Sequence, residues 1–428
     1  MYLSQVQSPY GFIYMRGDAF KGWMEKNPNG TFWENPLWGL QPGFYDDVNK
    51  GNFFQTNANI DISIPWVKGL SVKLLGTYTL SNRLKASFTH EQALVTKPAE
   101  MLDPSVNLSR AGGYMETSRT QSYLINAILN YSRTFGKHFV DASAVFERKA
   151  TNNSYVRFAG YNFADFGTTV LSYNGLNKAA STQYSGDAYD VLFSPPRMQS
   201  VLGRINYTFD NRYNASLSVR NDGSSAFAPG HKYSTFFAAA LGWTISNESF
   251  WKKNDIVNSL KFRLSWGENG NSGIGAYSHF AKVNSGYSYI FGTEEGKTLY
   301  IGNIPNQQLG WERKGEWNVG IDFTIIKNRI NGSLNYYNSV TRDLLVTSRI
   351  PIMNGFDNVL ENIGKVRNQG VELSLNSVNF ENKDFRWTTD YTFWLNRNKI
   401  LELDGSDSDK DGVPDDDISN RRFIGEPL

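Results

Sequence analysis

The 428-residue sequence predicts an all-β chain that forms an antiparallel transmembrane β-barrel. Three observations predict this fold. Apolar and polar residues alternate in segments of about 9 to 14 residues, which is the period of a β-strand. Charged residues keep to one face of these segments, and short and long connections alternate between them. Short turns on one side and long loops on the other are typical of outer-membrane barrels.

Twelve segments show the alternation, and the one that starts near position 199 shows it most clearly. There Val201, Gly203 and Ile205 form a dry face, while Arg204 and Asn206 form a wet one. The same two faces recur in the segments that start near positions 53, 70, 121, 138, 213, 233, 259, 315, 330, 369 and 385.

Charge is excluded from the dry face. A cationic side chain that faces lipid at mid-membrane costs about 2 to 4 kcal/mol, so a lipid-facing surface is expected to exclude it. Four apolar residues fall on the wet face: Leu75, Leu124, Ile128 and Trp394. A protein core would exclude charge as well, so this pattern alone does not separate a barrel from a sandwich. The strand charges on the wet face are Asp61, Lys73, Asp141, Glu147, Arg204, Arg220, Lys261, Arg263, Asp322, Glu372 and Asp390.

The connections separate the two architectures better. Long loops are expected after Leu80, Arg148, Arg220, Gly267 and Thr341, and loops of this length are uncommon in compact soluble domains. A β-propeller would show a repeat of roughly 40 to 50 residues, which the sequence lacks. A secreted β-protein remains the alternative. Tight links are expected at 65–69, 135–137, 210–212, 327–329 and 379–384, with a medium link at 246–258.

Composition excludes several classes of protein. The chain has no cysteine, which excludes disulfides, thiolate metal sites and a cysteine nucleophile. Its net charge of +2 argues against nucleic-acid binding. The most apolar run, 236–243, is far shorter than the roughly 18 residues that a membrane helix needs. Residues 1–5 lack the features of a signal peptide, so we expect an internal piece of a longer exported protein.

Several motifs resemble the SusC/RagA family of TonB-dependent outer-membrane transporters of Bacteroidetes. They follow the family's order from about residue 200 to 400, although Ala226 stands where the family commonly has a basic residue. The matching stretches are 203–207, 210–213, 218–225, 227–230, 242–243, 260–271, 304–306, 309–312, 343–345, Pro351, 355–356, 362–366, 368–373 and 398–400.

The resemblance implies a plugged barrel of 22 strands in the bacterial outer membrane that imports a large nutrient, a glycan oligomer or a peptide. Its implied partners are outer-membrane lipid, a SusD-like lipoprotein lid and the TonB complex. We expect residues 1–428 to be a partial barrel of about 12 strands, without the plug domain, TonB box, signal peptide and last strands of the family. Trp243, Trp266, Trp317 and Trp387 are expected in the interfacial girdles. Two alternatives stay open: a secreted or surface β-protein that binds glycans, and a siderophore or vitamin receptor.

No catalytic constellation is visible, so we expect the protein not to be an enzyme. The four histidines, His90, His138, His231 and His279, are scattered along the chain. A hydrolase would need a nucleophile placed beside a base.

Aromatic residues are frequent in the expected loops. Flat rings suit stacking on sugars and suit packing against a lid equally well. The alternative is that large loops need aromatic residues for small cores of their own. The candidate contacts for substrate or lid are Trp33, Trp38, Tyr161, Phe163, Tyr173, Tyr287, Tyr289 and Tyr300.

The acidic stretch 404–417 suggests a Ca²⁺ hypothesis. Asp407, Asp409 and Asp411 place carboxylates at alternate positions before a glycine, and Asp415 would supply a further ligand. An EF-hand is excluded, because Ile418 stands where the bidentate glutamate belongs. The alternative is a solvated acidic loop at the extracellular rim. No other cofactor is expected.

Overall fold

We describe the chain from a computed structural model. The residues it describes are 24–26, 32–34, 45–90, 111–161, 163, 171–185, 195–252, 255–291, 294–350, 353, 355–356, 358–403, 415–418 and 421–427. The chain divides into two compact units. Unit 1 comprises Met1–Thr56, Tyr78–Ser122 and Asn152–Ser194, and unit 2 comprises Asn57–Thr77, Tyr123–Thr151 and Pro195–Leu428.

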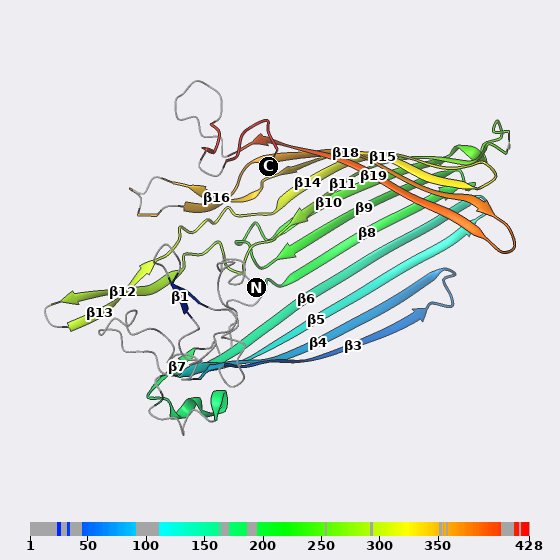
Figure 1. Ribbon diagram of the computed structural model, residues 1–428. Helices are drawn as coiled ribbons and strands as arrows, with labels where there is room; N and C mark the ends of the chain where they lie inside the picture. The colour runs from blue at the N-terminus through cyan, green and yellow to red at the C-terminus, as the bar shows by residue number, and fades with distance from the viewer. Residues whose placement is uncertain are drawn as a thin grey trace. The chain divides into compact units, whose positions relative to one another are not determined.

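All twelve predicted strands are confirmed, and they form one large sheet (Figure 1). Its order is β19-β18-β15-β14-β11-β10-β9-β8-β6-β5-β4-β3, with β7 (Ser181–Ser185) paired beside β6. The strands of this sheet are β3 (Tyr45–Ser63), β4 (Leu70–Thr89), β5 (Gly112–Phe135), β6 (His138–Tyr161), β8 (Met198–Phe209), β9 (Tyr213–Ser224), β10 (Tyr233–Thr244), β11 (Val257–Asn271), β14 (Glu312–Ile325), β15 (Ile330–Arg342), β18 (Lys365–Glu381) and β19 (Arg386–Glu402).

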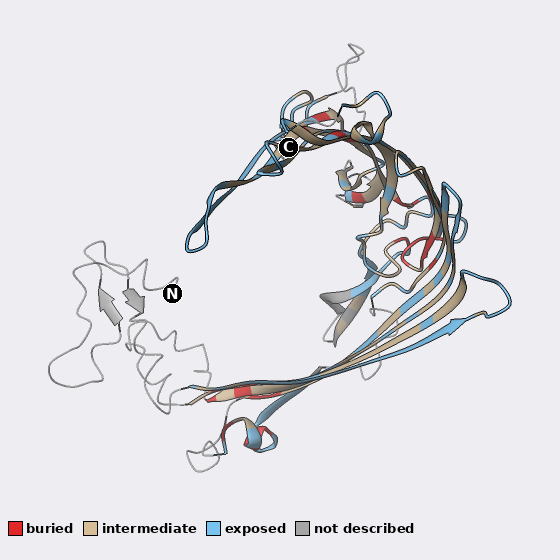
Figure 2. Ribbon diagram, turned by 90° about the vertical axis from the view of Figure 1, so that its right-hand side faces the viewer, coloured by how far each residue is buried: buried red, intermediate tan, exposed pale blue. Residues whose placement is uncertain are grey.

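The register of unit 2 keeps the two predicted faces separate from strand to strand. Gly203 pairs with Val219, which pairs with Phe237, and all three lie on the dry face. The dry face is exposed: Leu217 retains 63% of its accessible surface. Large apolar residues that no protein core covers are expected where a sheet faces lipid. In Figure 2 the strands are accordingly mostly intermediate or exposed.

Several strands are longer than predicted, and β3 to β6 are the longest: β3 already begins at Tyr45, before the expected start near position 53. β4 continues to Thr89, β5 begins at Gly112, and β6 continues to Tyr161, so the expected loop starts after Leu80 and Arg148 were wrong. The reason is physical. Beyond the hydrocarbon layer a β-ladder forms without strict alternation of apolar and polar side chains, so the pattern fades while the pairing continues.

The long loops contain short elements that the alternation did not predict. The hairpins are β1 (Met24–Lys26) with β2 (Phe32–Glu34), β12 (Val283–Phe291) with β13 (Glu294–Ile301), and β16 (Leu345–Arg349) with β17 (Asn358–Asn362). The described part of the chain also contains two short 3₁₀ helices, η3 (Ser172–Lys178) and η4 (Ile245–Asn247). No helix in the described ranges is long and apolar enough to cross a membrane.

The tight turns lie where they were predicted, and glycine is required at one of them. Gly69 has a φ of +90°, and a Cβ there would lie 2.2 Å from the carbonyl oxygen of Ser132 on β5. Gly136 also has a positive φ, of +60°, but a Cβ there would meet no atom within 4 Å. Both turns need the left-handed region, but only Gly69 also needs the space.

Candidate functional site

The wet face of unit 2 carries linked ion pairs. Arg220 on β9 contacts Asp222 at 2.6 Å and Glu147 on β6 at 3.3 Å. It also donates to the hydroxyl of Ser200 on β8 at 3.0 Å. Three neighbouring strands therefore share one guanidinium group, which is half-exposed on the wet face.

A second guanidinium group joins three further strands. Arg263 on β11 donates to Asp322 on β14 at 2.7 Å and to Asn335 on β15 at 2.9 Å. Gly320 lies between them in the register, and a Cβ at that position would be 2.5 Å from the Asn335 side-chain oxygen and 3.0 Å from the Arg263 guanidinium nitrogen. The glycine thus leaves room for the arginine to reach across the strand.

A shallow hollow of about 370 Å³ lies on the wet face and is lined by residues of β8 to β11 and of β14. Lys314 and Glu316 at its edge form an ion pair of 2.8 Å. The lining includes Arg204, Ser218 and Asn269 as well. Side chains of both charges and hydroxyl groups make this surface suitable for hydrated, polar solutes and unsuitable for apolar ones.

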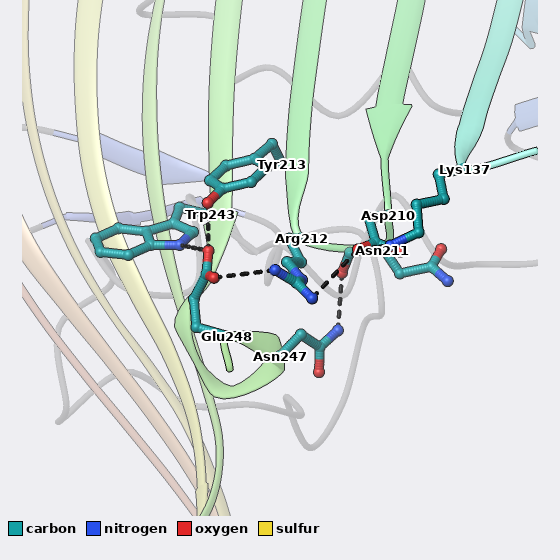
Figure 3. A network of polar contacts seen from close by, with 8 residues as sticks. All are labelled: Lys137, Asp210, Asn211, Arg212, Tyr213, Trp243, Asn247 and Glu248. Carbon is teal, nitrogen blue, oxygen red and sulfur yellow. Dashed lines mark hydrogen bonds and ion pairs between the residues drawn. The ribbon is translucent and has the colours of Figure 1, made fainter. Parts of the chain in front are cut away.

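At the other ends of these strands, charged side chains connect two tight turns and the medium link between β10 and β11 (Figure 3). Asp210, in the β8–β9 turn, contacts Lys137 of the β5–β6 turn at 3.0 Å and Arg212 at 3.2 Å. Arg212 also contacts Glu248, which follows η4, at 3.3 Å. Asn247 beside it donates to the backbone oxygen of Asn211 at 2.8 Å.

Two aromatic side chains from the dry face also hold Glu248. The Tyr213 hydroxyl donates to its carboxylate, and the Trp243 indole N–H donates to the same oxygen at 2.9 Å (Figure 3). These hydrogen bonds lower the pKa of Glu248 below its usual value, and the hydrogen bond from Lys137 lowers the pKa of Asp210. The turn network therefore favours two ionised carboxylates.

The long loops of unit 2 have a small core of their own. Phe227, Phe236, Leu309 and Trp311 are buried together, with the Trp311 ring 5.3 Å from Phe227 and 5.8 Å from Phe236. Most of these residues lie in the stretches that carry the SusC/RagA resemblance. The stretches that carry the resemblance thus supply most of this loop core.

Unit 1 has a separate loop core. Phe88 and Phe163 are buried with ring centroids 5.4 Å apart, and Tyr173 packs against them. His90 beside Phe88 contacts the Asp46 carboxylate at 2.7 Å. The burial of Phe163 favours the packing alternative for that residue.

Of the predicted aromatic contacts, the described residues show Phe163 and Tyr173 packed together in the loop core of unit 1. Tyr161 ends β6, where it pairs with Ser181 of β7, and Tyr300 lies half-exposed on β13. Trp33, Tyr287 and Tyr289 lie in strands whose side chains are outside the described set, and Trp38 lies outside the described residues. Substrate or lid contact stays a prediction for these residues.

The Ca²⁺ hypothesis also stays a prediction. Asp407, Asp409 and Asp411 lie outside the described residues, and Asp415 is described and half-buried. Within the described ranges, no group of three or more histidine, aspartate or glutamate side chains is arranged to hold a metal ion. Three of the four histidines contact other partners: His90 contacts Asp46, His138 bonds the Tyr207 hydroxyl at 2.7 Å, and His279 is buried against the backbone oxygen of Ala226 at 3.1 Å.

Sequence reasoning missed the turn network and the two shared guanidinium groups. The charges themselves were placed correctly on the wet face, but which of them meet depends on the register between strands. The only available signal was the position of Asp210 and Arg212 in a predicted tight turn.

Long antiparallel strands, a dry exposed face and a charged wet face define a transmembrane β-barrel protein of the outer membrane. The family model described as TonB dependent receptor-like, beta-barrel, matches residues 4–427, and the chain belongs to this family. The predicted resemblance to SusC/RagA proteins is confirmed by the comparisons that follow.

The chain is similar to three curated proteins. It is 31% identical to TonB-dependent receptor P3 of Formosa agariphila over 73% of this chain and 31% of that protein. It is 30% identical to receptor P39 of the same organism over 84% of this chain and 33% of that protein. It is 38% identical to TonB-dependent receptor SusC of Bacteroides thetaiotaomicron over 49% of this chain and 21% of that protein. The chain thus spans about a third or less of the curated relatives it matches.

The fold matches a solved structure. The RagAB peptide transporter shares it with a TM-score of 0.72 and 22% identity, over 87% of this chain and 38% of that chain. At this identity the match concerns the fold only.

Proposed function

We propose that this chain supplies part of the barrel wall of an outer-membrane importer that moves a large polar nutrient, a glycan oligomer or a peptide. The TonB complex would drive it from the periplasm, and a SusD-like lipoprotein would cap it from outside. Membership of the TonB-dependent receptor family supports this proposal. So does the length of the relatives, of which this chain covers only a part.

The observation that carries the proposal is the contrast between the two faces of one sheet. Leu217 on β9 is exposed on the dry face, whereas Arg220 on the same strand shares Glu147 and Asp222 on the wet face. A wall that is apolar toward lipid and hydrated toward a lumen suits the passage of polar solutes through a membrane.

The chemistry of the wet face favours an oligomer with many hydrogen-bonding groups. The hollow that includes Lys314, Glu316 and Asn318 offers charges of both signs and an amide. Sugar hydroxyls and peptide groups both satisfy such a surface, whereas an apolar ligand would leave its charges unsolvated. The role proposed for the wall is passage and not covalent chemistry.

An uptake assay in the native bacterium tests the proposal. The gene is deleted and restored, and the uptake of labelled glycan oligomers, labelled peptides and a ferric siderophore is compared. We expect deletion to abolish uptake of one polar oligomer class and an uncoupler of the proton gradient to have the same effect. Unchanged uptake of both oligomer classes would contradict the proposal, and loss of ferric siderophore uptake alone would favour the siderophore receptor.

The lid is tested separately. An affinity tag on the receptor should co-purify a lipoprotein encoded beside its gene, at about one copy per receptor. Recovery of the receptor without that lipoprotein from gently solubilised membranes would remove the SusD-like partner from the proposal and leave import intact.

A further inference from the structure

Unit 1 contains a second hollow, of about 450 Å³, across strands β3 to β6. Successive side chains along a strand point to opposite faces of the sheet. Some residues of the hollow therefore point their side chains toward it, and the others line it only with their backbone. Arg83 belongs to the second group, because its side chain donates to Asn49 on the opposite face. The residues whose side chains share the face of the hollow are Lys50, Asn52, Asn82, Leu84, Thr117, Arg119, Ser154 and Val156.

This face of the strands is the dry, lipid-facing one. On β3 the apolar Phe54, Ile60 and Ile62 have the same alternation as Lys50, whereas Phe53 is the one exposed aromatic residue between Lys50 and Ile62 on the other face. The other face of β3 carries Asp61, which pairs with Lys73 at 3.4 Å. The hollow therefore opens away from the wet face and toward the surroundings of the barrel.

The hollow lies just beyond the apolar part of the strands. Toward the long loops, Lys50 lies four residues beyond Phe54 on β3, and Asn82 lies four residues beyond Tyr78 on β4. Arg119 is two residues past Gln121, whose amide donates to the Tyr78 hydroxyl at 3.0 Å. Four strand residues at the usual tilt rise about 10 Å along the membrane normal. Since the long loops lie at this end, the hollow is at the level of the lipid headgroups of the outer leaflet.

The hollow is cationic. Among the described residues neither Lys50 nor Arg119 has a carboxylate within ion-pair distance, and both side chains are exposed. The nearest acidic residue along this face of β3 is Asp46, which is held by His90 at 2.7 Å. Asn52, Asn82, Thr117 and Ser154 surround the two cations with amides and hydroxyls.

We propose that this hollow binds the phosphate-bearing headgroup of a glycolipid in the outer leaflet of the outer membrane. The two cations would hold the phosphate, and the amides and hydroxyls would hold the adjoining sugar. Arginine and lysine are the usual phosphate-binding side chains, and asparagine and threonine suit sugar hydroxyls. The lipid-facing direction selects a membrane lipid over a solute in the lumen. The inference rests on the orientation of the strands and does not depend on which nutrient is imported.

Native mass spectrometry of the detergent-solubilised receptor tests the site, with bis-phosphorylated lipid A as the probe. The double variant K50Q/R119Q should bind this lipid about 25-fold more weakly, because each basic residue near an anionic lipid contributes roughly fivefold. The charge-preserving variant K50R/R119K should bind within about threefold of the wild type. Fully dephosphorylated lipid A should bind wild type and K50Q/R119Q equally.

The controls separate the site from general charge effects and from misfolding. The variant K68Q/K383Q removes two cations at the tight turns, and it should leave binding of lipid A unchanged. Inorganic phosphate at the same concentration should not displace the lipid, and displacement would point to a simple anion site and overturn the glycolipid assignment. Equal affinity of wild type and K50Q/R119Q, with both folded by size-exclusion chromatography and circular dichroism, would also overturn the proposal.

Discussion

Asn362 and Gly310 make a reciprocal pair of hydrogen bonds between two loop segments that lie far apart in the sequence. The Gly310 N–H donates to the Asn362 side-chain oxygen at 2.7 Å, and the Asn362 amide donates back to the Gly310 carbonyl at 3.0 Å. The Asn362 side chain thus takes the place of a neighbouring strand. The same amide also donates to the backbone oxygen of Asp343 at 2.9 Å. One side chain therefore joins three segments beside the loop core of unit 2.

Replacement of Asn362 by alanine should loosen that loop core. The Gly310 amide and carbonyl would lose their partner, at a cost of about 1 to 3 kcal/mol. Hydrogen exchange should show protection of residues 304–311 reduced by at least about tenfold. Asn152→Ala, an exposed asparagine on β6, is the matched control and should change nothing. Equal protection in both variants would show that Asn362 does not hold the loop.

Two adjacent alanines test the assignment of the faces. Ala239 lies on the dry face between Leu217 and Trp266, and Ala240 lies on the wet face between Ser216 and Ser265. Ala239→Arg should lower the free energy of unfolding in lipid vesicles by about 2 to 4 kcal/mol. Ala240→Arg should change it by less than about 1 kcal/mol, because the side chain remains hydrated. A larger effect at Ala240 would reverse the two faces.

The turn network predicts a dependence of stability on pH. The folded protein holds the pKa of Glu248 and of Asp210 below their ordinary values of 4.5 and 3.8. A carboxyl group whose pKa is lowered by folding stabilises the folded state at pH values above its ordinary pKa. This stabilisation is lost as the pH falls through the lowered pKa. The urea midpoint should therefore fall as the pH is lowered below about 4.5.

Glu248→Gln isolates this contribution from that of other carboxylates. At pH 7 the variant should have a lower urea midpoint than the wild type, because Arg212 loses an ionised partner. Its midpoint should then vary less between pH 7 and pH 3.5. Asp255→Asn is the control, since Asp255 is exposed and contacts only Lys327, at 3.4 Å, among the ion pairs of the described residues. A Glu248→Gln variant with the same pH profile as the control would refute the prediction.

The two turn glycines should respond differently to alanine. Gly136→Ala should cost roughly 1 kcal/mol, the strain of a left-handed residue with a side chain. Gly69→Ala should cost roughly 3 kcal/mol or more, because its Cβ would also overlap the Ser132 carbonyl and push β4 away from β5. Urea unfolding of both variants in vesicles measures the difference. Equal losses would mean that the β4–β5 contact yields without cost.

Some parts of the fold were predictable because lipid imposes a strict rule on them. Inside the hydrocarbon layer each outward residue must be apolar, so β8 and β9 show their faces in the sequence. The outer parts of β4, β5 and β6 are free of that rule, so the ends of β4 and β6 were placed too early and the start of β5 too late. The hairpins β12–β13 and β16–β17 were missed for the same reason, since neither alternates strictly.

The candidate sites were predictable only in part. The wet-face location of Arg220 and Arg263 followed from alternation, but their partners come from strands up to 73 residues away. The Glu248 contacts with Tyr213 depend on where β10 ends relative to β9. Such contacts depend on the register between strands, and the alternation within one strand does not determine that register.

The order of the large sheet follows the order of the chain, apart from the short loop hairpins and β7. A wall built in this way is modular. Two neighbouring strands and their turn form a hairpin. Outside the hairpin itself, its ladder contacts are made only with the strands directly before and after it. Duplication or loss of one such pair would change the circumference of the pore without rethreading any other strand, so gene duplication is a direct route by which a wall of this kind grows to admit bulkier cargo.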